Sequence, residues 1–193
     1  MLRHITLALF ALAVLGGCHQ QQTWKLKNVR HLLPDLKFTM QRAGDDKTVT
    51  AADYRGKTVL LYFGYTHCPD ICPTTLARLR AVLHGLGADA AKVQVLFVSV
   101  DPQRDDDATL AQYVHAFDPA FDGLRGSPAQ LAALAKRYRV GYTKQGNEPD
   151  GGYTMSHSSA VFIFDRAGHA RLLGDETAPV DAFDADLKQL LAG

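Results

Sequence analysis

The chain has 193 residues, of which 47% are hydrophobic and 21% charged, so it can bury the core of one ordinary domain and is not a disordered tail protein. Its 21 lysines and arginines stand against 20 aspartates and glutamates, and removal of an N-terminal segment containing Arg3 leaves 20 against 20. This balance provides no basic surface for nucleic acid, so no nucleic-acid partner is expected.

The first 17 residues have the pattern of a secretory signal. A basic start at Arg3 precedes an apolar run, residues 5–15, which is too short to span a bilayer as a helix. The L-G-G-C stretch that ends at Cys18 resembles the lipobox of bacterial lipoprotein signal peptides. This resemblance implies a signal peptide over 1–17, a lipidated Cys18 and a membrane-anchored lipoprotein that faces the periplasm or the cell exterior. An uncleaved anchor and a plain secreted protein with a spare thiol are the alternatives.

The polar residues that follow predict a lipidated N-terminus and tether over 18–31, ahead of one continuous domain over 32–193. Residues 36–40 and 48–49 predict an N-terminal hairpin extension. A buried strand over 58–63, a helix over 73–86 and a second buried strand over 93–100 then predict a right-handed parallel crossover.

The second half of the domain continues to alternate helices and strands. Residues 107–117 and 127–138 predict helices, the latter with Ser127 as its cap and Pro128 in its first turn. Residues 159–165 and 170–173 predict a hairpin, and 180–191 a closing helix. We therefore expect an α/β protein with a mixed central sheet flanked by helices. A thioredoxin-like fold fits this order, since its cysteines lie between a central strand and the next helix.

Cys68 and Cys72 are the only thiols of the domain once Cys18 is lipidated. A disulfide between them would close a very small loop and stabilise the fold little, so a structural role is not expected. If the turn at Cys72 is helical, both sulfurs lie on one side of it, about one turn apart. The helix N-terminus is expected to lower the pKa of these cysteines.

Two thiolates are too few for a closed structural zinc site, which requires four protein ligands. With one imidazole they suit copper, as Cu(I) or as Cu(II) with an added oxygen ligand. His67 adjoins Cys68, but neighbouring residues in an extended chain point apart, which makes it the weaker candidate. His157 ends a glycine-rich loop over 146–156, which in a thioredoxin-like topology passes beside the cysteines, and it is the preferred third ligand. The alternative is that this loop is only a flexible connector.

Three separated motifs together resemble the Sco family, also called SenC, of copper proteins that serve cytochrome c oxidase assembly. They are GYTHCPDICP at 64–73, SVDPQRD at 99–105 and YTMSHSSAVFIFD at 153–165. The resemblance implies that Cys68, Cys72 and His157 match the copper ligands of the family. It also implies that Asp70 and Asp101 match acidic positions near the site. Either carboxylate could accept a hydrogen bond beside the ligands, although a loop-capping role for Asp101 remains an alternative.

The function that the resemblance implies is an extracytoplasmic copper metallochaperone. It would bind one copper, Cu(I) or Cu(II) or both, and deliver it to the dinuclear copper centre of cytochrome c oxidase. The copper-accepting oxidase subunit is then the expected partner, with other periplasmic copper chaperones or thiol reductants as further candidates. The membrane would be reached through the lipid anchor.

Two enzymes remain as alternatives. A thiol-disulfide oxidoreductase would use Cys68 and Cys72 as its catalytic pair to reduce the cysteines of the oxidase copper site. Such reductases normally present C-x-x-C, and the additional residue here favours metal binding. A peroxiredoxin usually places a threonine three residues before its reactive cysteine, whereas Thr66 lies only two before Cys68.

Overall fold

The protein is described by a computed structural model over residues 23–146 and 152–193. The strands are β1 Lys27–Asn28, β2 Thr39–Arg42, β3 Thr48–Thr50, β4 Thr58–Gly64, β5 Val93–Ser99, β6 Asp122–Arg125, β7 Tyr142–Gln145, β8 Thr154–His157, β9 Val161–Phe164 and β10 Ala170–Gly174. The helices are α1 Ile71–Leu86, α2 Asp107–Phe117, α3 Pro128–Tyr138 and α4 Val180–Ala192, and the short 3-10 helices are η1 Ala51–Tyr54 and η2 Gly87–Lys92.

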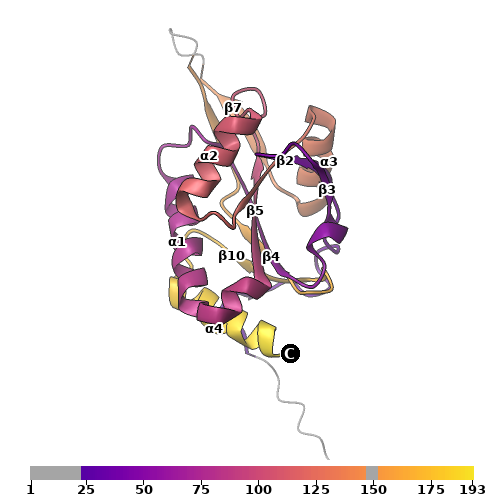
Figure 1. Ribbon diagram of the computed structural model, residues 1–193, viewed down its shortest axis with the longest axis vertical. Coiled ribbons are helices and arrows are strands. Elements are labelled where there is room, and N and C mark those ends of the chain that lie inside the picture. The colour runs from indigo at the N-terminus through magenta and orange to yellow at the C-terminus, as the bar shows by residue number, and fades with distance from the viewer. Residues whose placement is uncertain (1–22, 147–151) are drawn as a thin grey trace, which may run out of the picture.

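Eight of these strands form one mixed sheet in the order β1-β10-β9-β4-β5-β6-β2-β3. The central strand β4 runs parallel to β5 and antiparallel to β9. Helices α1, α2 and α4 lie on one side of this sheet, and α3 lies on the other (Figure 1). The thioredoxin-like fold expected from the order of elements is thereby confirmed, including the parallel crossover from β4 through α1 to β5.

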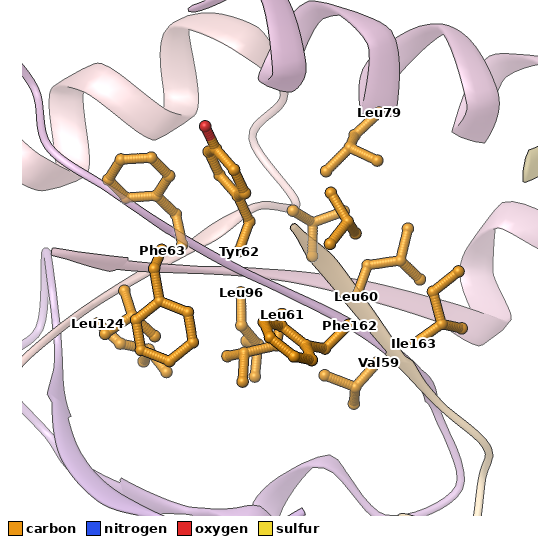
Figure 2. Packing of buried hydrophobic residues seen from close by; sticks show 14 of the residues in the cluster. Val59, Leu60, Leu61, Tyr62, Phe63, Leu79, Leu96, Leu124, Phe162 and Ile163 are labelled. Carbon is orange, nitrogen blue, oxygen red and sulfur yellow. The ribbon is translucent and has the colours of Figure 1, made fainter. Parts of the chain in front are cut away.

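The core is built around β4, all seven of whose residues are buried. Because alternate side chains point to opposite faces of a strand, β4 supplies both faces of the sheet with apolar groups. Figure 2 shows this division: the hydroxyl of Tyr62 points toward the helices above β4, whereas the ring of Phe63 lies on the opposite side. This rigid strand ends at Gly64, immediately before the first cysteine motif.

The segment before His157 differs from the expected loop. Thr154–His157 is strand β8, which pairs antiparallel with β7 in a separate two-stranded sheet, with Tyr142 opposite His157. Polar side chains dominate both strands, so their sequence lacks the hydrophobic alternation that marks a strand in the core.

Strand β6 is also absent from the sequence-based expectation, because its four residues include Asp122 and Arg125.

The packed domain begins earlier than Leu32, which corrects the tether expected over 18–31. Leu26 and Val29 are buried, and β1 pairs with β10. The buried carboxylate of Asp186 on α4 accepts hydrogen bonds from the backbone N–H groups of Lys25 and Leu26, at 3.0 and 2.7 Å. The expected signal peptide and the expected lipidation site, Cys18, lie outside the described residues.

Within residues 23–146 and 152–193, none of the helices combines the length and the apolar character needed to cross a bilayer.

Candidate metal centre

The two cysteines lie at the carboxyl end of β4, where the chain turns into α1. Cys68 is in the connecting loop and Cys72 is in the first turn of the helix, which begins at Ile71, two residues before the expected start. Gly64 makes room for this turn, because a Cβ atom at this position would lie 2.8 Å from the Cys72 Sγ atom. The end of a central strand and the start of a helix therefore position both sulfurs.

The sulfur of Cys68 also accepts a hydrogen bond from a backbone N–H in the first turn of α1. Asp70 is the N-cap residue, but its carboxylate makes no capping hydrogen bond. Instead the backbone N–H of Cys72 donates to the Cys68 Sγ atom at 3.4 Å. A free N–H of the first helical turn is thus directed at sulfur, which favours a Cys68 ligand that carries negative charge.

His157 reaches the cysteines from the end of β8. Its Nε2 atom lies 3.3 Å from the Cys72 Sγ atom. Its Nδ1 atom lies 3.0 Å from the carbonyl oxygen of Ser158, and because a carbonyl can only accept, this contact assigns the proton of the neutral ring to Nδ1. The lone pair of Nε2 then faces the sulfurs, in the tautomer that metal coordination requires.

Sγ of Cys68, Sγ of Cys72 and a ring nitrogen of His157 lie within 4.8 Å of one another. Metal bonds to sulfur and imidazole of about 2.0 to 2.3 Å place three ligand atoms roughly 3.5 to 4 Å apart around one ion. A small inward movement of these side chains would therefore bring all three into bonding distance. Within the described parts of the chain, no other group of His, Cys, Asp or Glu residues has such an arrangement.

Burial controls the protonation of two of the candidate ligands. Desolvation raises the pKa of the Cys72 thiol to about 12, and desolvation lowers the pKa of His157 below its usual value. The expected lowering of the Cys72 pKa by the helix N-terminus is therefore wrong, because loss of solvation outweighs the helix dipole at a fully buried sulfur. Without metal, Cys72 is a thiol and His157 a neutral imidazole, and a metal ion would displace the Cys72 proton.

Aromatic side chains enclose the cluster. The buried phenol of Tyr62 donates a hydrogen bond to the Cys72 Sγ atom at 3.7 Å, and burial raises the pKa of this phenol, so it stays a donor. The rings of Tyr62 and Tyr65 meet the His157 ring edge-on, with centroids 6.2 and 5.7 Å away. Tyr62 belongs to the buried strand expected over 58–63, and its place two residues before the end of β4 is the signal that points to the site.

The two expected acidic residues have different surroundings. Asp70 is exposed and accepts a hydrogen bond from the Thr74 hydroxyl at 3.4 Å. Asp101 is buried and accepts hydrogen bonds from the Tyr153 hydroxyl, at 2.8 Å, and from the Arg104 guanidinium. Asp101 therefore contacts the segment that leads to His157, whereas Asp70 stays at the surface.

A second buried carboxylate, Asp105, binds the cysteine loop at Thr66 and is not among the expected site residues. It accepts hydrogen bonds from the hydroxyls of Ser99 and Thr66, at 2.6 and 2.7 Å, and burial raises its pKa. His67 lies on this side of the loop, with Nδ1 3.0 Å from the Thr66 hydroxyl oxygen, and it is outside the cysteine and His157 cluster. The lower expectation for His67 as a ligand agrees with this placement.

Comparison with known proteins places the chain near one family. The SCO1/SenC family model matches residues 35–192 of the chain. A mitochondrial protein SCO2 homolog of Bos taurus is 45% identical over 154 residues, which cover 79% of this chain and 57% of the bovine protein. The chain spans about half the length of the first curated relatives that it matches.

Solved structures of related proteins have the same fold. ScoI of Bradyrhizobium japonicum with copper bound is 40% identical, with a TM-score of 0.73 over 81% of this chain and 98% of the other. ScoI of Arabidopsis thaliana, also with copper bound, is 33% identical, with a TM-score of 0.76 over 82% of this chain and 98% of the other. Two relatives that are each at least 33% identical to the chain thus hold copper in their structures.

Proposed function

The chain belongs to the SCO1/SenC family, and we propose that it is a copper metallochaperone that carries one copper ion on Cys68, Cys72 and His157. The Sco family is a family of cytochrome c oxidase assembly proteins. The copper is cargo in this proposal, and its destination is the dinuclear copper centre of cytochrome c oxidase. The single observation that carries the proposal is the convergence of two sulfurs and one imidazole nitrogen within 4.8 Å.

The donor set suits copper in both oxidation states. Two thiolates are soft ligands that hold Cu(I) in a low-coordinate geometry, and the imidazole nitrogen adds the harder donor that Cu(II) prefers. The neutral Nε2 lone pair of His157 is available at neutral pH, because burial lowers the pKa of the ring. Delivery would exchange these ligands one at a time for the thiolates of an acceptor, so that the copper is never released into water.

Titration of the purified, reduced protein with copper tests this function. We expect one equivalent to bind per chain, with sulfur-to-copper charge-transfer bands for Cu(II). The comparison is the variant Cys68→Ala, Cys72→Ala, His157→Ala, in which all three donors are replaced. Copper affinity that is equal in the two proteins would refute the proposal. Delivery is then measured as stoichiometric transfer to the copper-binding domain of the oxidase subunit.

Thiol-disulfide exchange is the second candidate function, and the presence of two neighbouring free cysteines, four residues apart, supports it. Cys68 would attack an acceptor disulfide and release one acceptor thiol; Cys72 would then attack the mixed disulfide, forming the Cys68–Cys72 disulfide and releasing the second thiol. The high pKa of Cys72 makes the resolving step slow, which favours the metal-binding role. Rapid turnover on an acceptor disulfide without copper transfer would instead favour the disulfide-exchange role over the metal-binding role.

For its location, we propose that Cys18 is lipidated and anchors the domain on the periplasmic or outer side of a bacterial membrane. The L-G-G-C stretch at 15–18 supports this assignment. Metabolic labelling with a fatty acid tests it: the label should enter the wild-type chain and be absent from Cys18→Ser. Label in both proteins, or in neither, would contradict a lipid anchor at this residue.

A further inference from the structure

His157 is carried by a structural unit that stands apart from the main sheet. Strands β7 and β8 form their own two-stranded sheet, and a hairpin of this size is marginally stable by itself. Figure 1 shows β7 at the end of the molecule opposite the C-terminus, beyond the carboxyl ends of β4 and β5. The position of the imidazole at the sulfurs therefore depends on whatever ties this hairpin to the core.

Three of these ties lie on Tyr153, the residue immediately before β8. Its hydroxyl donates to the Asp101 Oδ1 atom at 2.8 Å, and its carbonyl oxygen accepts from the Arg104 Nη1 atom at 2.9 Å. The Arg104 guanidinium also lies over the Tyr153 ring, with Cζ 3.6 Å from the ring centroid. One tyrosine is thus held by its hydroxyl, its ring and its backbone.

The partners of Tyr153, Asp101 and Arg104, are themselves fixed in the turn that follows β5. Asp101 is 3% exposed, and its backbone N–H donates to the Ser99 hydroxyl at the end of β5. Its carbonyl oxygen accepts from the backbone N–H groups of Arg104 and Asp105, which closes the turn after β5. Arg104 is bound to the Asp101 Oδ2 atom through Nε, so the guanidinium is fixed before it contacts Tyr153.

We propose that Arg104 and Tyr153 are positioning residues, which with Asp101 form a latch that holds His157 at the two sulfurs. Because β8 runs without interruption from Thr154 to His157, a fixed Tyr153 restrains the imidazole at the other end of the strand. The same guanidinium lies 5.7 Å from the centroid of the Tyr65 ring, whose ring contacts His157. The latch therefore restrains the imidazole in two ways, through strand β8 and through the ring of Tyr65.

The inference rests on the proposed function for its effect on copper. An imidazole held in place contributes more to Cu(II), which prefers nitrogen ligands, than to Cu(I), which two thiolates can retain. The latch would therefore raise Cu(II) affinity and leave Cu(I) affinity nearly unchanged. Opening of the latch would release one of the three ligands, which is the first step that transfer to an acceptor needs.

Tyr153→Phe is the sharpest test, since it removes the hydrogen bond to a carboxylate and keeps the ring under Arg104. We expect Cu(II) affinity to fall about tenfold and Cu(I) affinity to change by less than about twofold. In a His157→Ala background, the same substitution should no longer alter Cu(II) affinity, because the residue through which it acts is absent. Arg104→Lys, which keeps the charge but loses the fork of donors, should behave in the same way.

Tyr142→Phe is the matched control. Tyr142 lies directly opposite His157 on β7, and its hydroxyl makes no hydrogen bond within the described residues, so its loss should leave both affinities unchanged. A Tyr153→Phe effect on Cu(II) of equal size with and without His157, or no effect at all, would overturn the latch. In both cases copper binding by the wild type would still support the proposed function.

Hydrogen exchange in the metal-free protein tests the latch without copper. Amides of β8 should exchange about tenfold faster in Tyr153→Phe than in the wild type, while those of β4 stay protected. Unchanged exchange in β8 would overturn the latch. Faster exchange in a protein that binds no copper would support the latch while the proposed function fails.

Discussion

The Nε2 atom of His157 lies 3.3 Å from the Sγ atom of Cys72, although 85 residues of sequence separate the two. The contact joins a strand of the small β7–β8 sheet to the first turn of α1 at the end of the central strand β4. The hydrogen bond from Nδ1 to the Ser158 carbonyl turns the lone pair of Nε2 toward the sulfur. Two of the three candidate ligands are therefore already in contact, with the Nε2 lone pair directed at sulfur.

Replacement of the imidazole should weaken Cu(II) binding much more than Cu(I) binding. We expect His157→Ala to weaken Cu(II) binding by about a hundredfold, because a metal ligand is lost, and to retain much of the Cu(I) binding through the sulfurs. Competition with chelators specific for each ion measures both affinities. His67→Ala is the control, since the His67 side chain is 53% exposed and contacts Thr66 instead of the sulfurs. Equal losses in the two variants would mean that His157 has no special role.

The hydrogen bond from Tyr62 to Cys72 should adjust the redox properties of bound copper. A donor at a thiolate withdraws electron density from the sulfur, which disfavours Cu(II) relative to Cu(I). Tyr62→Phe should therefore lower the Cu(II)/Cu(I) potential by about 50 mV and shift the charge-transfer band to lower energy. Tyr65→Phe is the comparison, because the hydroxyl that it removes bonds to the Met155 backbone and not to sulfur. The idea fails if both variants have the potential of the wild type.

The two thiols of the metal-free protein should react at very different rates. Cys72 is 0% exposed with a pKa of about 12, whereas Cys68 is 8% exposed. At pH 8 only about one Cys72 in ten thousand is then a thiolate, which is the reactive form. Iodoacetamide should label Cys68 first, and labelling of Cys72 should rise about tenfold per pH unit between pH 8 and 10. Mass spectrometry of peptides from the wild type and Cys68→Ser measures this, and equal rates at pH 8 would contradict it.

The N-terminal segment should be part of the folding unit. Asp186→Ala leaves the N–H groups of Lys25 and Leu26 without their carboxylate acceptor, and we expect the free energy of unfolding to fall by about 2 kcal/mol in urea. Asp181→Ala is the control, because the Asp181 side chain is 76% exposed and its ion pair with Lys25 should contribute less than about 0.5 kcal/mol. A similar small loss in both variants would show that residues 23–29 are not held in solution as they are in the structure.

Much of the fold follows from the sequence itself. The buried runs at β4 and β5, the periodicity of α1 to α4 and the cap at Ser127 are local signals, and the structure has each element within a few residues of its expected bounds. The number of cysteines also restricts the chemistry, because two thiolates are too few for a closed structural zinc site. The choice of His157 over His67 rests on topology and on the family resemblance, and both rest on patterns present in the chain.

Only the tertiary structure places the remaining parts of the site. The β7–β8 hairpin is largely polar, and Tyr153 just before β8 bonds to Asp101 and Arg104, contacts that no periodicity reveals. The pKa of Cys72 depends on its complete burial among groups that include Tyr62 and Gly64, and the helix N-terminus alone does not predict it. Hydrophobic patterns and caps act between near neighbours in sequence and can be found there. Desolvation and long-range hydrogen bonds depend on which distant groups meet, and folding decides that.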